Sequence, residues 1–332
     1  MKKILIFILA IITTFSLVGC GKKDKKTDNK IKKIKVAEVT HSMFYAPLYV
    51  SDALGYFKEN NLDVDIILTS GANNVAAAVM SGDVEIGLCG SEQTIYIYNE
   101  GAEDYLINFA GLTKRDGSFL VSREKNDEFD LNDLENSWII GGRNGGMPAM
   151  TLAYTINEQK INNVNIDTSI DFAAMSGAFI AGSGDYVTLF EPNALKLEQE
   201  GYGYVVASLG KIGGEVPYTV FNTKKSYLEK NPDVIEGFSK SIQMGLDYVH
   251  THTAEEVAEV IAPYFADNTL NEITEVAKRY MDNDSWYQTT YITKEGFEHI
   301  KEIIDFNGLL TKDTPYDKIV DNTYNHEYYS RD

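Results

Sequence analysis

One stretch, residues 34–68, constrains the fold most, because it predicts a strand, a helix and a second strand in close succession. Apolar residues alternate at both of its ends, as they do in strands. Between them, Ser42 suits an N-cap, Pro47 suits the first turn of a helix, and Gly55 suits the left-handed conformation that ends one. Two strands joined through a helix form a parallel βαβ unit, so we expect an α/β protein.

Strands and helices continue to alternate after this unit. The pattern predicts strands over 84–88, 106–112 and 119–122, then a second set over 137–140, 168–172, 186–190 and 203–208, each set with helices between its strands. Glycines at 210, 213 and 214 are expected to loosen the chain before a return strand at 217–221. Residues 224–311 are helical in pattern. The chain is therefore predicted to leave one lobe near 112–118, build a second, and return near 210–217, which makes a clamshell with two hinge crossings.

The N-terminus has the features of an export signal. Two lysines and a short apolar run end at Leu17-Val18-Gly19-Cys20, which is typical of a lipoprotein signal cut before a lipidated cysteine. The predicted organisation is a signal peptide over 1–19, a lipidated Cys20 with a flexible Lys-rich tether over 20–33, lobe 1 over 34–116 and 217–332, and lobe 2 over 117–216. If Cys20 carries lipid, Cys89 has no intramolecular disulfide partner.

Charge and length narrow the function classes. The 332 residues carry a formal net charge of −19, which argues against nucleic acid as a partner. This charge suits a protein outside the cytoplasm.

Two runs in this order resemble a known family. The first comprises Tyr45-Ala46-Pro47-Leu48-Tyr49, Gly55-Tyr56-Phe57-Lys58 and Leu62-Asp63-Val64; the second extends from Ser70 to Gly87. Together they are similar to the periplasmic solute-binding proteins of aliphatic sulfonates, nitrate and thiamine pyrimidine precursors. Asn61 stands where glycine is commoner, and asparagine tolerates the same backbone.

The resemblance implies a fold and a role. The fold would be a two-lobed periplasmic-binding-protein clamshell of type II. The role would be a substrate-binding lipoprotein of an ABC importer, a monomer without a cofactor whose partners are a small-molecule ligand, an ABC permease and an ATPase. The protein would lie outside the cytoplasm, and the lipid on Cys20 would anchor it to the cell membrane.

Candidate binding residues lie where predicted strands end, because ligands of open α/β sheets bind beyond the C-terminal ends of the strands. Helix N-termini also converge there and attract anionic or accepting groups. The candidates are His41, Ser42, Phe44, Tyr45, Ser70, Gly71, Asn73, Gly90, Ser91, Arg143, Asn144, Gly145, Glu191 and Tyr218. For Ser42, Asn73 and Ser91 the alternative is that each only caps its own helix.

Two charged candidates favour different ligands. Arg143 could clamp an anion such as a sulfonate or nitrate, or form a salt bridge at the rim. Glu191 could accept from an amino or ring N–H group, or pair with Arg143. The aromatic candidates and Glu191 together favour a nitrogen heterocycle such as a thiamine pyrimidine precursor, with the sulfonate or nitrate type as the alternative.

Enzyme motifs are missing from the sequence. The glycines at 141–146 match neither the dinucleotide fingerprint nor the phosphate loop, and no spacing of His, Cys and carboxylates predicts a metal site. Fungal synthases of the thiamine pyrimidine resemble this chain but use a Cys-rich motif and an active-site histidine, and only Cys89 is available here. We therefore expect a binding protein. An enzyme on the same fold and a surface adhesin or sensor are the alternatives from other classes.

Overall fold

The computed structural model describes residues 30–325. The predicted signal peptide, Cys20 and residues 20–29 of the predicted tether lie outside this range. Two five-stranded sheets organise the described part, with strand orders β2-β1-β3-β10-β4 and β7-β6-β8-β5-β9. One apolar core contains buried side chains from the strands of both sheets.

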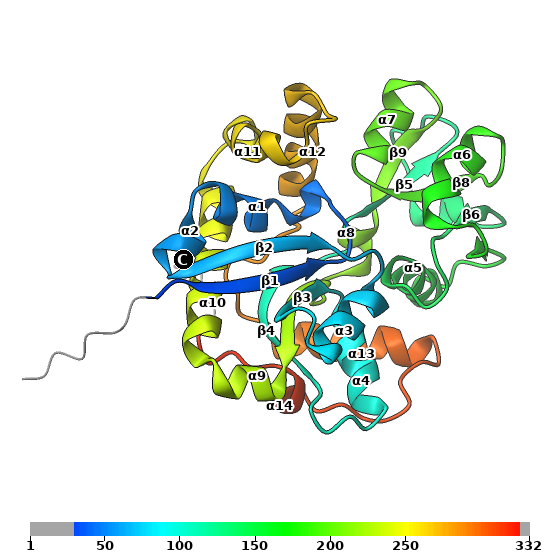
Figure 1. Ribbon diagram of the computed structural model, residues 1–332. Helices are drawn as coiled ribbons and strands as arrows, with labels where there is room; N and C mark the ends of the chain where they lie inside the picture. Colours follow the sequence, from blue (N-terminus) through cyan, green and yellow to red (C-terminus); the bar gives the residue numbers. More distant parts are fainter. Residues whose placement is uncertain (1–29, 326–332) are drawn as a thin grey trace, which may run out of the picture. The chain divides into compact units, whose positions relative to one another are not determined.

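The first sheet contains the predicted βαβ unit. Its strands are β1 (Lys32–Glu38), β2 (Leu62–Leu68), β3 (Ile86–Cys89), β4 (Leu106–Thr113) and β10 (Thr219–Lys224). Strand β1 lies parallel to β2 and β3, whereas β10 runs antiparallel between β3 and β4 (Figure 1). Its connecting helices are η1 (Met43–Tyr45), α1 (Ala46–Ala53), α2 (Tyr56–Glu59), α3 (Ala72–Ser81) and α4 (Glu92–Asn99).

The second sheet is built from the middle of the chain. Its strands are β5 (Ser118–Ser122), β6 (Trp138–Ile140), β7 (Asn165–Asp167), β8 (Tyr186–Phe190) and β9 (Tyr204–Ser208). Strand β6 is parallel to β7 and β8, and β5 is antiparallel to β8 and β9. Its helices are η2 (Leu131–Leu134), α5 (Met147–Glu158), η3 (Phe172–Ala174), α6 (Met175–Ile180), α7 (Asn193–Gln199) and α8 (Leu209–Gly213).

The C-terminal third is helical, as its sequence pattern predicts. It contains α9 (Lys225–Lys230), α10 (Pro232–Thr251), α11 (Ala254–Ile261), η4 (Ala262–Tyr264), α12 (Leu270–Asp282), α13 (Lys294–Phe306) and α14 (Tyr316–Ile319). Helix α10 packs on α1 and α2, and α13 contacts both α4 and α5. Gly245 lets α10 approach α1, because a Cβ there would come within 2.2 Å of the Pro47 carbonyl oxygen. Within residues 30–325, no helix has the length and apolar character needed to span a membrane.

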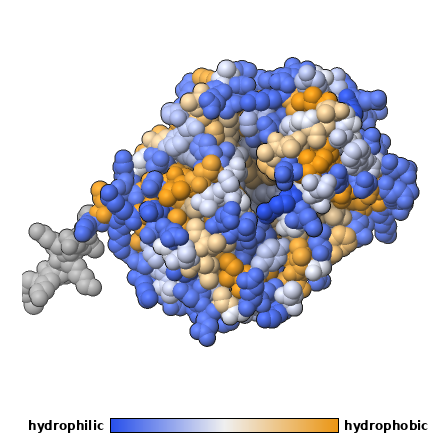
Figure 2. Space-filling model, turned by 45° about the vertical axis from the view of Figure 1, so that its right-hand side comes forward, coloured by the Kyte–Doolittle hydropathy of each residue, from blue (hydrophilic) through white to orange (hydrophobic). Residues whose placement is uncertain are grey.

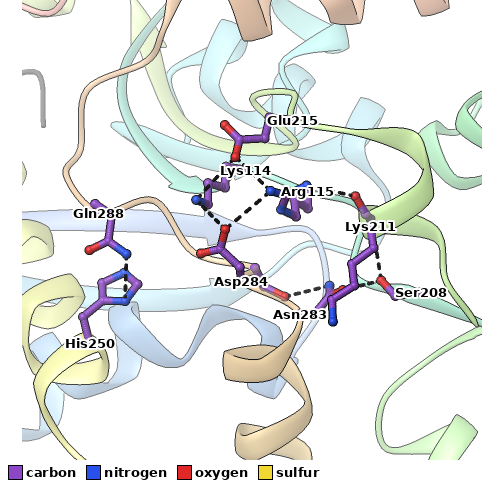
Figure 3. A network of polar contacts seen from close by, with 11 residues as sticks. Lys114, Arg115, Ser208, Lys211, Glu215, His250, Asn283, Asp284 and Gln288 are labelled. Carbon is purple, nitrogen blue, oxygen red and sulfur yellow. Dashed lines mark hydrogen bonds and ion pairs between the residues drawn. The ribbon is translucent and has the colours of Figure 1, made fainter. Parts of the chain in front are cut away.

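The chain passes between the sheets from β4 to β5 and again from β9 to β10. Charged side chains tie these two segments together (Figure 3). Lys114 lies 2.8 Å from Asp284, and Arg115 lies 2.9 Å from Glu215. Ser208, which ends β9, also donates to the side chain of Asn283. Both crossings are therefore attached to the turn that follows α12.

The structure differs from the expected elements near the N-terminus. The chain after Ser42 forms three short helices where one was expected. Gly55 ends the helix α1 in the left-handed conformation, as predicted, with a φ of 78°, but Phe57, expected in the same helix, lies in α2. Ser42 does cap η1, accepting from the Phe44 amide at 3.2 Å. Asn73 does not cap α3; Gly71 holds the N-cap position, so Asn73 lies inside the first turn. Asn61 adopts the left-handed conformation expected of it, with a φ of 60°.

Two further expectations were wrong in the second half of the chain. The strand expected at 168–172 lies earlier in the chain, as β7, and ends at Asp167. The Asp167 carboxylate accepts hydrogen bonds from the amide and the hydroxyl of Ser169, which stabilises a turn there. The glycines at 210 and 213 lie in helix α8 and allow close packing. A Cβ at Gly210 would come within 2.2 Å of the Asp116 carbonyl oxygen.

Candidate functional site

An aromatic cluster lies where the ends of strands from both sheets meet. Its centre is the buried ring of Phe44, on η1 after β1. Ring centroids of Tyr280, Tyr218 and Phe190 lie 4.9, 5.9 and 6.0 Å from that of Phe44. Phe190 ends β8 of the second sheet, whereas Tyr218 precedes β10 of the first. Of the predicted aromatic candidates, Phe44, Tyr45 and Tyr218 are thus brought together.

Tyr45 lies next to Phe44, with 5.8 Å between the ring centroids. Burial raises the pKa of its phenol well above the ordinary value, and the negative charges of Glu38 and Glu92 add to the effect. None of the hydrogen bonds between described residues involves its hydroxyl group. This hydroxyl therefore remains available as a hydrogen-bond donor inside the cluster.

Glu92, the first residue of α4, lies at the end of β3 with a side chain that is only 4% exposed. Its carboxylate sits over Gly90, where a Cβ would come within 1.9 Å of Oε2. Gln93 donates to Oε1 at 3.2 Å, but Oε2 has no partner among the described residues. Burial raises the pKa of Glu92, and Arg143 lowers it only in part.

Asp116 lies on the first crossing and is 1% exposed. Its Oδ1 accepts from the amide and hydroxyl of Ser118 at 2.7 and 2.6 Å. Oδ2 has no partner of ordinary hydrogen-bond geometry among the described residues, although the Tyr218 hydroxyl is close enough to lower the pKa of the carboxyl. Burial outweighs these effects and raises the pKa of Asp116 to about 6.

Glu191 follows β8 as predicted, but both of its oxygens are engaged within the chain. Arg279 of α12 donates to Oε1 at 2.6 Å, and the Leu195 amide donates to Oε2 at 2.8 Å. Burial raises the pKa of Glu191, and Arg279 opposes the rise. Its cationic partner is thus Arg279, not Arg143. Direct contact with a ligand stays a prediction that would require these bonds to be exchanged.

Ser91 and Gly90 lie between β3 and α4, at the edge of the cluster. The Ser91 hydroxyl does not cap α4; it donates to the Pro217 carbonyl oxygen at 2.6 Å and so joins β3 to the second crossing. Both residues are buried.

His41 belongs to a polar network beside the cluster. Its Nδ1 lies 2.9 Å from the buried carboxylate of Glu38, and its Nε2 lies 2.8 Å from the Tyr264 carbonyl oxygen. Tyr49 donates to the other Glu38 oxygen at 2.5 Å. The His41 ring also stacks on Phe265, with centroids 4.8 Å apart. Both ring nitrogens are therefore engaged within the chain.

The remaining candidates lie near the surface, at or just before the first turns of α3 and α5. Ser70 and Asn73 are exposed at the start of α3, where Gly71 has a φ of 99°. Arg143 and Asn144 are exposed before α5, with Gly145 half-buried. Arg143 nevertheless acts on the pKa of Glu92, so its charge reaches the cluster. None of the ion pairs between described residues includes Arg143.

Cys89 is a poor nucleophile in this setting. It is a buried free thiol whose sulfur accepts from Asn222 at 3.3 Å, and burial raises its pKa to about 12. Among residues 30–325, no cluster of three or more His, Cys, Asp or Glu side chains could hold a metal ion.

Two hollows lie elsewhere on the surface. One of about 390 Å³ is lined by Ala53, Leu54, Val260, Pro263 and Tyr264. Another of about 250 Å³ lies beside Phe119, Glu198 and Arg279. On the face drawn in Figure 2, apolar residues form small patches separated by hydrophilic ones. Neither hollow is lined by the predicted binding residues.

Four residues of the site escaped sequence reasoning. Glu92 directly follows the predicted Gly90-Ser91 pair, so its position at a strand end was the available signal. Asp116 reads as an ordinary turn residue in the sequence. Arg279 and Tyr280 lie on α12, and no sequence pattern shows that this helix packs against η1.

Comparison with known proteins places the chain in a family. A family model described as "NMT1/THI5 like" matches residues 43–256, which is more than half of the chain. The chain belongs to the NMT1/THI5-like family. The predicted resemblance is thereby confirmed.

Relatives of this NMT1/THI5-like chain include binding proteins. A Bacillus subtilis (strain 168) protein named "Putative binding protein YtlA" is 40% identical over 314 residues, covering 94% of this chain and 92% of that protein. A 4-amino-5-hydroxymethyl-2-methylpyrimidine phosphate synthase of Candida albicans (strain WO-1) is 25% identical over 236 residues, covering 65% and 66%. The more similar relative supports the prediction of a binding protein over an enzyme.

A solved structure confirms the fold class. The alkanesulfonate-binding protein SsuA from Xanthomonas axonopodis pv. citri, bound to MOPS, superposes with a TM-score of 0.69 at 11% identity, covering 89% of this chain and 99% of that one. The chain thus has the periplasmic binding protein fold.

Proposed function

We propose that this protein is the substrate-binding lipoprotein of an ABC importer and that it captures a small nitrogen-bearing heterocycle, such as a thiamine pyrimidine precursor, between its two lobes. The aromatic cluster around Phe44 is the observation that carries the proposal. Its rings come from both sheets, so a flat ligand stacked there would contact both lobes at once. Closure of the two lobes on the ligand would follow.

The charges around the cluster support the same ligand class. Glu92 and Asp116 are buried there, and Arg279, the cation nearest to Glu191, is occupied by that carboxylate and by Glu198. A bare anion would meet uncompensated negative charge in such a site. The name of the Candida albicans relative includes an aminopyrimidine, and a ligand of this kind would fit the same site.

A sulfonate or nitrate ligand is the second candidate. Arg143, which has no ion-pair partner among the described residues, precedes the N-terminus of α5 and could turn toward an anion. The fold of the alkanesulfonate-binding protein shows that such ligands are compatible with this architecture.

The proposed role also implies a location and partners for the protein. The lipid on Cys20 would hold the protein outside the cell membrane, as a monomer with lobes at 34–116 with 217–332 and at 117–216. A permease and an ATPase would receive and transport the ligand.

Mass spectrometry of the molecule released from natively purified protein tests the proposal. An unchanged nitrogen heterocycle is expected. A sulfonate would favour the second candidate, a chemically converted product would favour an enzyme, and an empty protein that binds host surfaces would favour an adhesin.

A further inference from the structure

Glu92 and Asp116 share a feature that is uncommon in folded proteins. Each is more than nine-tenths buried, and each has one carboxyl oxygen without a hydrogen-bond partner among the described residues. Most buried polar atoms in native proteins are paired, because an unpaired one loses its hydration without compensation. Glu92 Oε2 therefore calls for a donor from outside the chain, and Asp116 Oδ2, which the Tyr218 hydroxyl approaches without ordinary hydrogen-bond geometry, can accept one as well.

Glu191 shows what a buried carboxylate with a full set of partners looks like in this same protein. It is 3% exposed, and both of its oxygens are occupied, one by a guanidinium and one by a helix amide. No Lys, Arg or His of the described residues lies within ion-pair distance of Glu92 or Asp116. The chain thus provides a full set of donors for one buried acid and an incomplete set for the other two.

The two incomplete acids are next in sequence to residues that contact the aromatic cluster or its neighbours. Ser91, next to Glu92, donates to the carbonyl oxygen of Pro217, which precedes Tyr218, at 2.6 Å. Burial raises the pKa of Tyr218 most, and the charges of Asp116 and Glu92 add to the rise. Gly117, next to Asp116, packs against the Phe44 ring, where a Cβ would come within 2.7 Å. A flat molecule stacked in the cluster would therefore lie near both carboxyls.

We propose that Glu92 and Asp116 are the specificity-determining residues of the site, and that each accepts a hydrogen bond from one of two separate donor groups on the ligand, such as an amino group and a hydroxyl group. This inference rests on the proposed function and specifies its ligand by donor pattern. Tyr45, whose hydroxyl is free, would donate to a ring nitrogen of the same molecule. An alkanesulfonate offers only acceptors to these carboxyls and would be rejected.

Calorimetry with two probes tests the inference. The probes are 4-amino-5-hydroxymethyl-2-methylpyrimidine and ethanesulfonate, which has no hydrogen-bond donor, titrated into the full chain and into Glu92→Gln, Asp116→Asn and the control Glu100→Gln. Glu100 is an exposed carboxylate that follows α4, so its change tests for a general charge effect. We expect the pyrimidine to bind the unchanged protein, and Glu92→Gln and Asp116→Asn each to weaken it about tenfold or more. The control should stay within about twofold.

Thermal unfolding without ligand separates binding from a structural role. Each amide variant removes an unpaired buried acid, so its melting temperature should equal or exceed that of the unchanged protein. Lower melting temperatures with unchanged affinity would overturn the inference. If Glu92→Gln does not fold, Glu92→Asp, which withdraws the carboxylate by one methylene, takes its place with the same expected loss of affinity.

The outcomes distinguish this inference from the proposed function. Tighter binding of ethanesulfonate than of the pyrimidine would overturn the inference and leave an importer protein of the sulfonate type. If neither probe binds, the molecule released from purified protein decides. A nitrogenous molecule that is retained by the unchanged protein and lost by both amide variants supports the inference, and any other released molecule overturns it. Protein that binds neither probe and releases nothing would refute the proposed function as well.

Discussion

Arg279 of α12 reaches the buried carboxylate of Glu191, with Nη1 2.6 Å from Oε1, and so joins the C-terminal helices to the end of β8 in the second sheet. The same guanidinium donates to Glu198 of α7. The neighbouring Tyr280 hydroxyl lies 3.3 Å from the Glu191 amide. These contacts cross from the first-sheet helices to the second sheet at the aromatic cluster, so they would have to break when the lobes open.

Removal of this contact should destabilise the protein. Arg279→Ala leaves the Glu191 carboxylate buried without its cation, and we expect a loss of about 2 to 3 kcal/mol in the free energy of unfolding, measured by urea denaturation. Lys278→Ala is the matched control, since Lys278 forms an exposed pair with Asp282 on the same helix and should cost no more than about 0.5 kcal/mol. Equal effects of the two changes would show that the Arg279 contact adds nothing.

Asp116 should make stability depend on pH. Its pKa is raised from the ordinary 3.8 to about 6, so between these pH values the folded state holds a proton that the unfolded state has lost. The free energy of unfolding should therefore fall as the pH rises through this window, by on the order of 2 to 3 kcal/mol. Asp116→Asn lacks this dependence. Urea denaturation at pH 4 and pH 7 compares the free energies of unfolding of Asp116→Asn and the unchanged protein. Relative to the unchanged protein, Asp116→Asn should be more stable at pH 7 than at pH 4. The same difference in free energy at both pH values would contradict this assignment.

Gly90 gives a way to move Glu92 without changing its charge. A methyl group at position 90 would collide with the Glu92 carboxylate, whose Oε2 lies 1.9 Å from the Cβ position. Because the obstacle is the end of a flexible side chain, Gly90→Ala should fold with little loss of stability. Affinity for 4-amino-5-hydroxymethyl-2-methylpyrimidine should fall about tenfold in calorimetry.

Gly177→Ala is the matched control for this change, since a Cβ at Gly177 on α6 meets nothing within 4 Å. It should leave the affinity unchanged. Full affinity of Gly90→Ala would mean that the position of the Glu92 carboxylate does not matter for binding.

Sequence patterns were sufficient for most of the fold but for only part of the site. Alternating apolar residues and Ser42 predicted the opening βαβ unit because these signals act over a few neighbouring residues. The glycines at 210 and 213 were misread as flexible, since their role is close packing against Asp116 and Thr151, which lie far away in sequence.

The same limit applies to the binding residues. Glu191 was predicted from its place after a strand, yet its partner Arg279 is 88 positions further on, and no local pattern links the two. Glu92 and Asp116 stand out only when burial and hydrogen-bond partners are known. Exposed candidates such as Ser70 and Arg143 were predicted because they lie at strand or helix ends. The sequence does not say which of these ends face the aromatic cluster.

Ligand binding should make the molecule more compact. The chain crosses twice between the sheets, so the lobes can rotate about these segments and close on a ligand. Small-angle scattering should show a smaller radius of gyration with 4-amino-5-hydroxymethyl-2-methylpyrimidine than without it. Without ligand, the radius of gyration of the Arg279→Ala variant should be at least as large as that of the unchanged protein. Tight binding with no compaction would argue against closure about these two crossings.

Cys20 should anchor the mature protein. The lipoprotein signal that ends at Cys20 predicts that Cys20→Ala leaves the protein soluble or unprocessed. Membrane fractionation of cells measures this. Lys22→Ala, two residues away, is the control and should stay with the membranes. An unchanged membrane fraction of Cys20→Ala would refute the anchor.

The central claim is that a nitrogenous ligand lies in the aromatic cluster and donates to Glu92 and Asp116. A crystal structure of the protein with 4-amino-5-hydroxymethyl-2-methylpyrimidine tests it most directly. We predict that the pyrimidine stacks against the rings around Phe44, with its amino nitrogen and its hydroxyl oxygen each within about 3.2 Å of one of the two carboxyl oxygens, Glu92 Oε2 and Asp116 Oδ2. A pyrimidine bound away from both carboxyls, or a sulfonate held by Arg143 in its place, would contradict the account.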